Sequence, residues 1–345
     1  MHMADALMSP VVSGTMIATT AGIATYSVKK VQNELDDKKI PLMGIMGAFI
    51  FASQMINFTI PGTGSSGHIG GGLLLAILLG PYAGFLTMAS VLLIQALFFA
   101  DGGLLAYGAN VFNLGFYACF IVYPLIYKRF VEKGYSKKRI FSGAIISAII
   151  ALQMGAFSVV LETLFSGKTE LPFVNFLLLM QPIHLAIGIV EGIVTAAVVS
   201  FVWKARPEII EKSASGESIG DVSIRRVSLV LLICVLVIGG GLSWFASTNP
   251  DGLEWSMAKT AGTEELIADG EIYSKASEIQ EQTAFLPDYS FKSSGDEEIE
   301  TEAWPSVSGG TSVSGVLGGV MTLALAMLTG VIITLTKRRT TRKMI

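Results

Sequence analysis

Long apolar runs recur along this chain and constrain its fold more than any other feature. A helix needs about 20 apolar residues to cross a bilayer, and only 15% of the 345 residues are charged, against roughly 25% in soluble domains. We therefore expect an all-α, polytopic membrane protein with about nine spans, one of them (73–79) too short to cross alone. The apolar runs cover residues 10–28, 41–60, 73–79, 84–100, 110–127, 140–165, 172–203, 227–245 and 313–335.

Basic side chains predict how these spans are oriented. Lys and Arg are enriched in cytoplasmic loops of membrane proteins. Placing residues 29–39, 128–139, 204–226 and 337–345 on the cytoplasmic side puts 20 of the 24 Lys and Arg there. The pattern predicts a multi-pass protein of the cell membrane, with the N-terminus outside and the C-terminus in the cytoplasm.

The chain divides near a polar linker. We expect a transmembrane domain at residues 1–203, a cytoplasmic linker at 204–226, and a hairpin of two spans at 227–345. The hairpin encloses an outer segment, residues 247–310, that holds 14 of the 27 carboxylates. This segment either raises the local cation concentration or is a solvated loop. Four aromatic residues indicate that parts of it pack: Trp255, Phe285, Tyr289 and Trp304.

The first two residues form a potential chelator. Nothing at the start resembles a signal peptide, so we expect the mature chain to begin Met1-His2. The amine and the His2 amide nitrogen close a five-membered ring on a metal, and the amide and imidazole Nδ1 close a six-membered one. Such nearly planar nitrogen sites suit Ni(II) or Cu(II). The alternative is an unremarkable histidine on a frayed terminus.

A fourth nitrogen must come from elsewhere, and the chain has only two other histidines, His68 and His184. His68 lies in a glycine-rich loop, residues 61–72, ahead of the short run. Irregular backbone at membrane depth persists only where protein buries it or it lines a cavity. The loop is thus expected to be partly re-entrant, with His68 pointing into the bundle. The competing interpretation is a loop histidine with no ligand role.

Ionisable residues within the later spans are candidates for function by default. His184 and Glu191 are seven residues apart and share a helix face, and with Glu162 they suggest a membrane metallohydrolase. No H-E-x-x-H motif supports this, and the favoured interpretation is interhelical hydrogen bonding or a contact surface for a partner subunit. The sequence Ser166-Gly167-Lys168-Thr169 lacks the earlier glycine of a phosphate-binding loop, so ATP-driven transport would need an ATPase on another chain.

Four motifs give the chain a family resemblance. Residues 1–203 resemble the CbiM/NikM substrate-binding (S) components of energy-coupling-factor transporters for cobalt and nickel. Later segments resemble the small CbiN/NikN accessory subunit of the PDGLE type, so the two modules look fused. The matching motifs are MHMADALMSP from Met1, SGHIGGG from Ser66, HLAIGIVEG from His184 and PDGLEW from Pro250.

The resemblance implies an S-component bundle of about seven helices and a C-terminal two-helix hairpin. It implies that Met1, His2 and His68 bind Ni²⁺ or Co²⁺ as the transported substrate, with no catalytic cofactor and no enzymatic activity. The implied partners are a membrane coupling (T) component and cytoplasmic ATPases, and no nucleic acid. The alternatives from other classes are the metallohydrolase and a cation sensor using the acidic outer segment.

Overall fold

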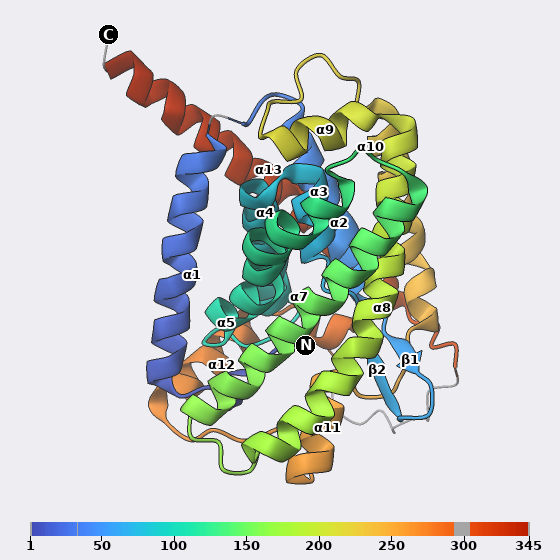
Figure 1. Ribbon diagram of the computed structural model, residues 1–345. Helices are drawn as coiled ribbons and strands as arrows, with labels where there is room; N and C mark the ends of the chain where they lie inside the picture. The colour runs from blue at the N-terminus through green and yellow to red at the C-terminus, as the bar shows by residue number, and fades with distance from the viewer. Residues whose placement is uncertain (1, 33, 293–303, 344–345) are drawn as a thin grey trace.

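The computed structural model describes residues 2–32, 34–292 and 304–343, which are mostly helical (Figure 1). A short antiparallel hairpin of β1 (Phe58–Ile60) and β2 (Ser65–Gly67) interrupts the helices. The first part contains η1 (Asp5–Leu7), α1 (Pro10–Val31), α2 (Lys39–Gln54), α3 (Gly72–Leu79), α4 (Pro81–Phe98), α5 (Tyr107–Val111), the π-helical η2 (Phe112–Tyr127), α6 (Lys128–Val131), α7 (Lys137–Phe165) and α8 (Phe173–Ala205). The second part contains α9 (Pro207–Ser215), α10 (Arg225–Gly240), η3 (Leu242–Phe245), α11 (Gly252–Ala261), α12 (Glu271–Thr283), η4 (Pro287–Tyr289) and α13 (Gly309–Lys343).

Six helices of the described chain are long and apolar enough to cross a membrane: α1, α4, Tyr107–Val131, α7, α8 and Gly309–Lys337. They account for six of the nine expected spans, and the multi-pass all-α architecture is confirmed. The other three are shorter helices, α2, α3 and α10, of 16, 8 and 16 residues. The run 41–60 is shortened because its last three residues leave the helix and pair with β2.

The short helix α3 lies at the centre of the bundle, and all eight of its residues are buried. Two glycines allow the chain to enter it. Gly71 has φ +83°, a left-handed conformation that favours glycine. A Cβ on Gly72 would lie 2.2 Å from the carbonyl oxygen of Leu114 in η2. The glycine-rich loop therefore delivers the chain into the interior, as the sequence predicts for a re-entrant segment.

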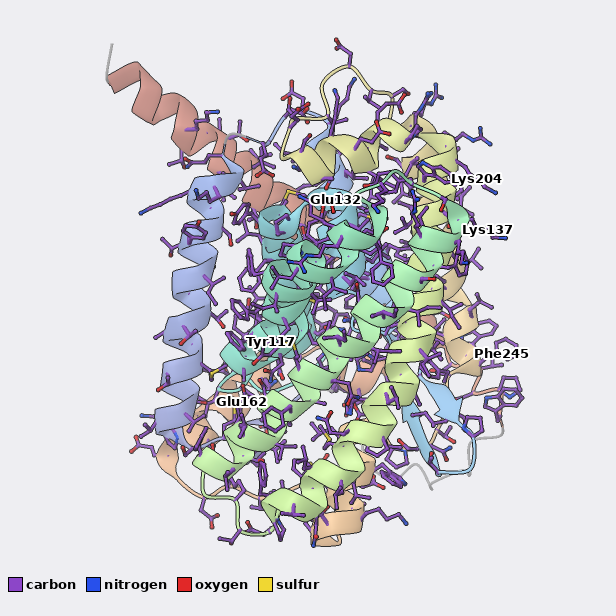
Figure 2. The ribbon with its side chains drawn as sticks, in the orientation of Figure 1. Tyr117, Glu132, Lys137, Glu162, Lys204 and Phe245 are labelled. Carbon is purple, nitrogen blue, oxygen red and sulfur yellow. The ribbon has the colours of Figure 1, made fainter. Side chains whose placement is uncertain are left out.

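Labelled residues locate the two ends of the bundle. Lys137, Lys204 and Glu132 lie toward the end occupied by α9, whereas Glu162 lies toward the end where α11 and α12 pack (Figure 2). The helix α13 runs from the α12 end to the α9 end (Figure 1). The β-hairpin and the acidic segment between α10 and α13 thus share one end of the molecule.

Helix α13 packs closely through small residues, both within the C-terminal hairpin and against the first part. Helix α13 packs against α2 and α10. A Cβ on Gly315 would lie 2.2 Å from the carbonyl oxygen of Gly239 in α10, and one on Gly318 would lie 2.0 Å from the Phe51 ring in α2. The glycine pattern of the last span thus produces close helix packing.

We expect Gly315→Ala to destabilise the protein by about 1–3 kcal/mol, because the added methyl group must force two backbones apart. The measurement is the thermal unfolding midpoint of the purified chain in detergent. Gly14→Ala is the matched control, because a Cβ on Gly14 in α1 meets no atom within 4 Å. Equal midpoints for the two variants would contradict the close-packing argument.

Candidate metal-binding site

Two histidines that are 66 positions apart in sequence lie together at the end of the bundle where α11 packs. The rings of His2 and His68 stack with centroids 4.9 Å apart and an interplanar angle of 18°. The His2 side chain is 6% exposed, and His68 is 8% exposed. Met1, the third predicted ligand residue, lies outside the described residues. The sequence pattern predicted only that the two histidines lie on the same side of the membrane. The structure brings their rings into contact.

Asn110 in α5 clamps the chain immediately after His2. Its side-chain oxygen accepts a hydrogen bond from the Met3 backbone nitrogen at 2.8 Å, and its side-chain nitrogen donates to the Met3 carbonyl at 3.1 Å. The Gly103 backbone nitrogen donates to the same carbonyl at 2.9 Å. The Asp5 carboxylate accepts two further backbone hydrogen bonds from this loop. These bonds anchor the start of the chain, so His2 has little freedom.

The His2 ring has two distinct sides. Its Nδ1 lies 2.8 Å from a carboxylate oxygen of Asp101, whereas Nε2 is buried without a hydrogen-bond partner among the described residues. Burial opposes ionisation of Asp101, but attraction to His2 and hydrogen bonds from His2 and Tyr289 outweigh it and hold the pKa of this carboxyl below its ordinary range. Nδ1 is the nitrogen expected to close the chelate ring, so Asp101 competes for it.

The tautomer of His68 suits metal ligation. Its Nδ1 lies 3.0 Å from the carbonyl oxygen of Ile69, which accepts hydrogen bonds only, so Nδ1 carries the proton of the neutral ring. Burial lowers the pKa of His68 to about 3, which keeps the ring neutral at pH 7. The lone pair is then on Nε2, and a backbone partner on the other nitrogen is typical of metal-binding histidines.

Glu191 in α8 fixes the loop that follows His68. Its carboxylate accepts hydrogen bonds from the Gly70 backbone nitrogen at 2.7 Å and from the Gly71 backbone nitrogen at 3.0 Å. The Gln54 side chain donates to the Gly70 carbonyl at 2.9 Å. Glu191 thus makes structural hydrogen bonds, but to the backbone of the loop ahead of α3 and not to another helix.

The three residues of the hydrolytic hypothesis are engaged separately. His184 places Nδ1 2.8 Å from the Met180 carbonyl and lines a cavity of about 10 Å³ together with His68, room for about one water. Glu162 accepts a 2.8 Å hydrogen bond from Asn113. Among the described residues, no group of three or more His, Cys, Asp or Glu side chains is gathered to hold a metal. An ion held by His2 and His68 must therefore take its other ligands from elsewhere, such as the backbone.

Residues at the start of α11 cover the loop that bears His68. The Ser66 backbone nitrogen donates to the Pro250 carbonyl at 2.8 Å, and the Trp255 indole donates to the Thr63 carbonyl at 3.0 Å. Asp251 begins α11 with a capping box closed by Glu254. A pocket of about 200 Å³ opens beside His2, and its acidic lining comprises Asp5, Asp101, Glu254, Glu264, Glu265 and Asp288. Five predicted acidic positions lie outside the described residues: Asp296, Glu297, Glu298, Glu300 and Glu302.

Sequence reasoning missed the residues that position the histidines. Asn110 stands at the start of an apolar run, and Gln54 and Gln95 lie within apolar helices. Polar side chains inside spans are rare and costly, so this rule could have marked all three. Asp101 follows a span and does not lie inside it, so this rule does not mark it as a functional residue.

The helical bundle carries a buried imidazole pair beside an acidic pocket. Its relatives are named as metal transport proteins, which places the chain in a transporter class rather than among enzymes. The chain belongs to the CbiM family, the cobalt uptake substrate-specific transmembrane region, whose model matches residues 2–209. A PDGLE domain matches residues 225–335. The resemblance to a CbiM/NikM component fused to a PDGLE-type module is thereby confirmed.

Individual relatives agree with this assignment. A protein of Archaeoglobus fulgidus, provisionally named a fused nickel transport protein NikMN, is 38% identical over 62% of this chain and 70% of its own length. The cobalt transport protein CbiM of Geobacter sulfurreducens is 29% identical over 68% of this chain and 70% of its own. A crystal structure of a truncated transition metal transporter matches with a TM-score of 0.52 and 32% identity, covering 59% of this chain and 99% of that one.

Proposed function

We propose that this chain captures Ni²⁺ or Co²⁺ on the outer side of the cell membrane, as the substrate-binding subunit of an ATP-driven importer of the energy-coupling-factor type. The observation that carries the proposal is the stacking of His2 on His68, with ring centroids 4.9 Å apart. The relatives that transport nickel or cobalt support the choice of ion. Both ions accept imidazole ligands.

The ion is held by four nitrogens in this proposal. Met1 contributes its amine, His2 its backbone nitrogen and Nδ1, and His68 its Nε2. Chelation through Nδ1 requires the His2 ring to exchange its contact with Asp101 for the metal. The tautomer of His68 leaves Nε2 as its ligand atom. Because no set of carboxylate and histidine side chains is gathered among the described residues, the remaining ligands in this proposal are the amine and a backbone nitrogen. A planar four-nitrogen site favours nickel over cobalt.

The two-part organisation follows from the same proposal. Residues 1–203 form the S-component domain, residues 204–226 are a cytoplasmic linker, and residues 227–345 are the accessory hairpin. The acidic pocket beside His2 concentrates divalent cations at the site entrance, which favours the outer side for this end. The partners are a membrane T component and cytoplasmic ATPases, because no nucleotide-binding motif occurs in this chain.

The test is Ni²⁺ and Co²⁺ binding to the purified full-length chain by isothermal titration calorimetry, comparing two histidine variants. We expect His68→Ala to weaken binding at least about 100-fold, since a direct ligand is lost and a lost supporting partner alone costs about 10–100-fold. His184→Ala is the control, because this buried histidine lines the neighbouring cavity without being a proposed ligand. Strong loss in His184→Ala with binding retained in His68→Ala would move the site into the bundle.

A further inference from the structure

A continuous chain of hydrogen bonds joins the two histidine-bearing segments, and its middle member comes from the outer segment between α10 and α13. The Tyr289 hydroxyl donates to Asp101, the carboxylate that contacts His2 Nδ1. The Gln95 side-chain nitrogen donates to the same hydroxyl at 3.3 Å. Tyr289 therefore contacts the partner of His2 directly and is separated from His2 by one residue.

The chain continues from Gln95 to the loop of His68. The side-chain nitrogen of Gln95 also donates to the Gln54 side-chain oxygen at 3.0 Å, and Gln54 donates to the Gly70 carbonyl at 2.9 Å. Gln95 is fully buried and Gln54 is 5% exposed. Buried polar networks of this kind fix the relative position of the elements that they connect.

Tyr289 is itself firmly placed. Its ring stacks on Phe99 with centroids 5.1 Å apart and contacts the Phe51 ring edge-on at 6.1 Å. The backbone nitrogen of Asp288 donates to the Phe99 carbonyl at 2.9 Å. Three non-glycine residues at this junction have positive φ, namely Ala100, Asp288 and Tyr289. Such conformations persist only where surrounding contacts hold them and are concentrated at functional sites.

From this geometry we propose that Tyr289 is a positioning residue for the metal site: through Asp101 on one side and Gln95 and Gln54 on the other, it sets the position of His2 relative to His68 in the ion-free protein, before His2 Nδ1 exchanges Asp101 for the metal. The outer segment between α10 and α13 thereby takes part in ion binding without supplying a ligand. This inference rests on the proposed capture of Ni²⁺ or Co²⁺ by His2 and His68.

Removing the hydroxyl alone tests the proposal. Tyr289→Phe keeps the ring between its aromatic neighbours but interrupts the chain of hydrogen bonds. Asp101 then holds His2 Nδ1 more strongly. We expect the Kd for Ni²⁺ to rise about 10- to 100-fold, with a shifted ligand-field absorption spectrum of the bound nickel. Tyr273→Phe is the matched control. It removes another hydroxyl of the outer segment, which donates to the Met8 carbonyl at 2.7 Å. This hydroxyl is not part of the chain of hydrogen bonds that includes Tyr289.

A double-mutant cycle distinguishes positioning from general loss of structure. Gln95→Met breaks the same chain on the other side of Tyr289, so the double variant with Tyr289→Phe should bind no more weakly than the poorer single variant, because both act through one network. Additive effects, or a Tyr289→Phe variant whose Kd and nickel spectrum match the wild type, would overturn the inference. Absence of Ni²⁺ binding by the wild-type chain would instead overturn the proposed function, and the inference with it.

Discussion

A two-residue extension ahead of Met1 is expected to abolish tight Ni²⁺ binding while the protein stays folded. The extension moves the amine away from the His2 chelate, so the site loses at least one of its four nitrogens and the favourable five-membered ring. The loss should exceed the roughly 10–100-fold cost of a missing supporting partner. Titration calorimetry on detergent-solubilised protein measures the affinity, and thermal unfolding checks that the bundle persists.

The length of the extension matters for this experiment. A single added residue places the histidine third in the chain, where an amine, two backbone nitrogens and the imidazole make a four-nitrogen chelate without help from His68. Two added residues avoid that artefact. The control is the same dipeptide added after Ile345, which should leave the affinity unchanged. An extended protein that binds Ni²⁺ at full strength would show that the free amine is not a ligand.

Glu191→Gln is expected to weaken Ni²⁺ binding by about 10–100-fold. The carboxylate accepts hydrogen bonds from the backbone nitrogens of Gly70 and Gly71, and hydrogen bonds to a charged group contribute about 1.5–3 kcal/mol each. An amide retains one accepting oxygen but turns a donor toward the other backbone nitrogen. The loop carrying His68 should therefore lose its fixed position, and the free energy of unfolding should fall by about 2–3 kcal/mol.

Glu162→Gln provides the matched control for this prediction. Glu162 is also a buried carboxylate on a membrane helix, but it accepts its hydrogen bond from Asn113 and does not contact the loop of His68. Its Kd for Ni²⁺ should stay within about threefold of wild type, because Glu162 shares no hydrogen-bond partner with the Gly70 and Gly71 backbone. Equal losses in both variants would indicate that buried carboxylates matter only for the stability of the bundle.

The sequence predicted the helical membrane architecture because apolar runs and basic loops are local signals. The pairing of His2 with His68 was expected from the predicted membrane orientation and from the family resemblance, since the residues alone left His184 as a second candidate. The early end of α2 was not predicted. Residues 58–60 are apolar enough to continue a span, and only their pairing with β2 decides their conformation.

The residues that support the site could not be predicted from the sequence for a different reason. Asp101 and Tyr289 are 188 positions apart, and no local pattern reports such a contact. The aromatic residues of the outer segment indicated packing, but not that one hydroxyl would reach the carboxylate beside His2. Long-range polar contacts depend on how whole helices are arranged, which single-sequence patterns do not specify.

The clamp on Met3 has a consequence for how cargo moves. With Asn110 holding the third residue by both of its backbone groups, the tether bearing the proposed chelator is two residues long and reaches about 7 Å at most. A two-residue segment of this length cannot accompany an ion through a bilayer about 30 Å thick. The ion must therefore reach the other side of the membrane through reorientation of the surrounding helices, or it must first dissociate from the chelating residues.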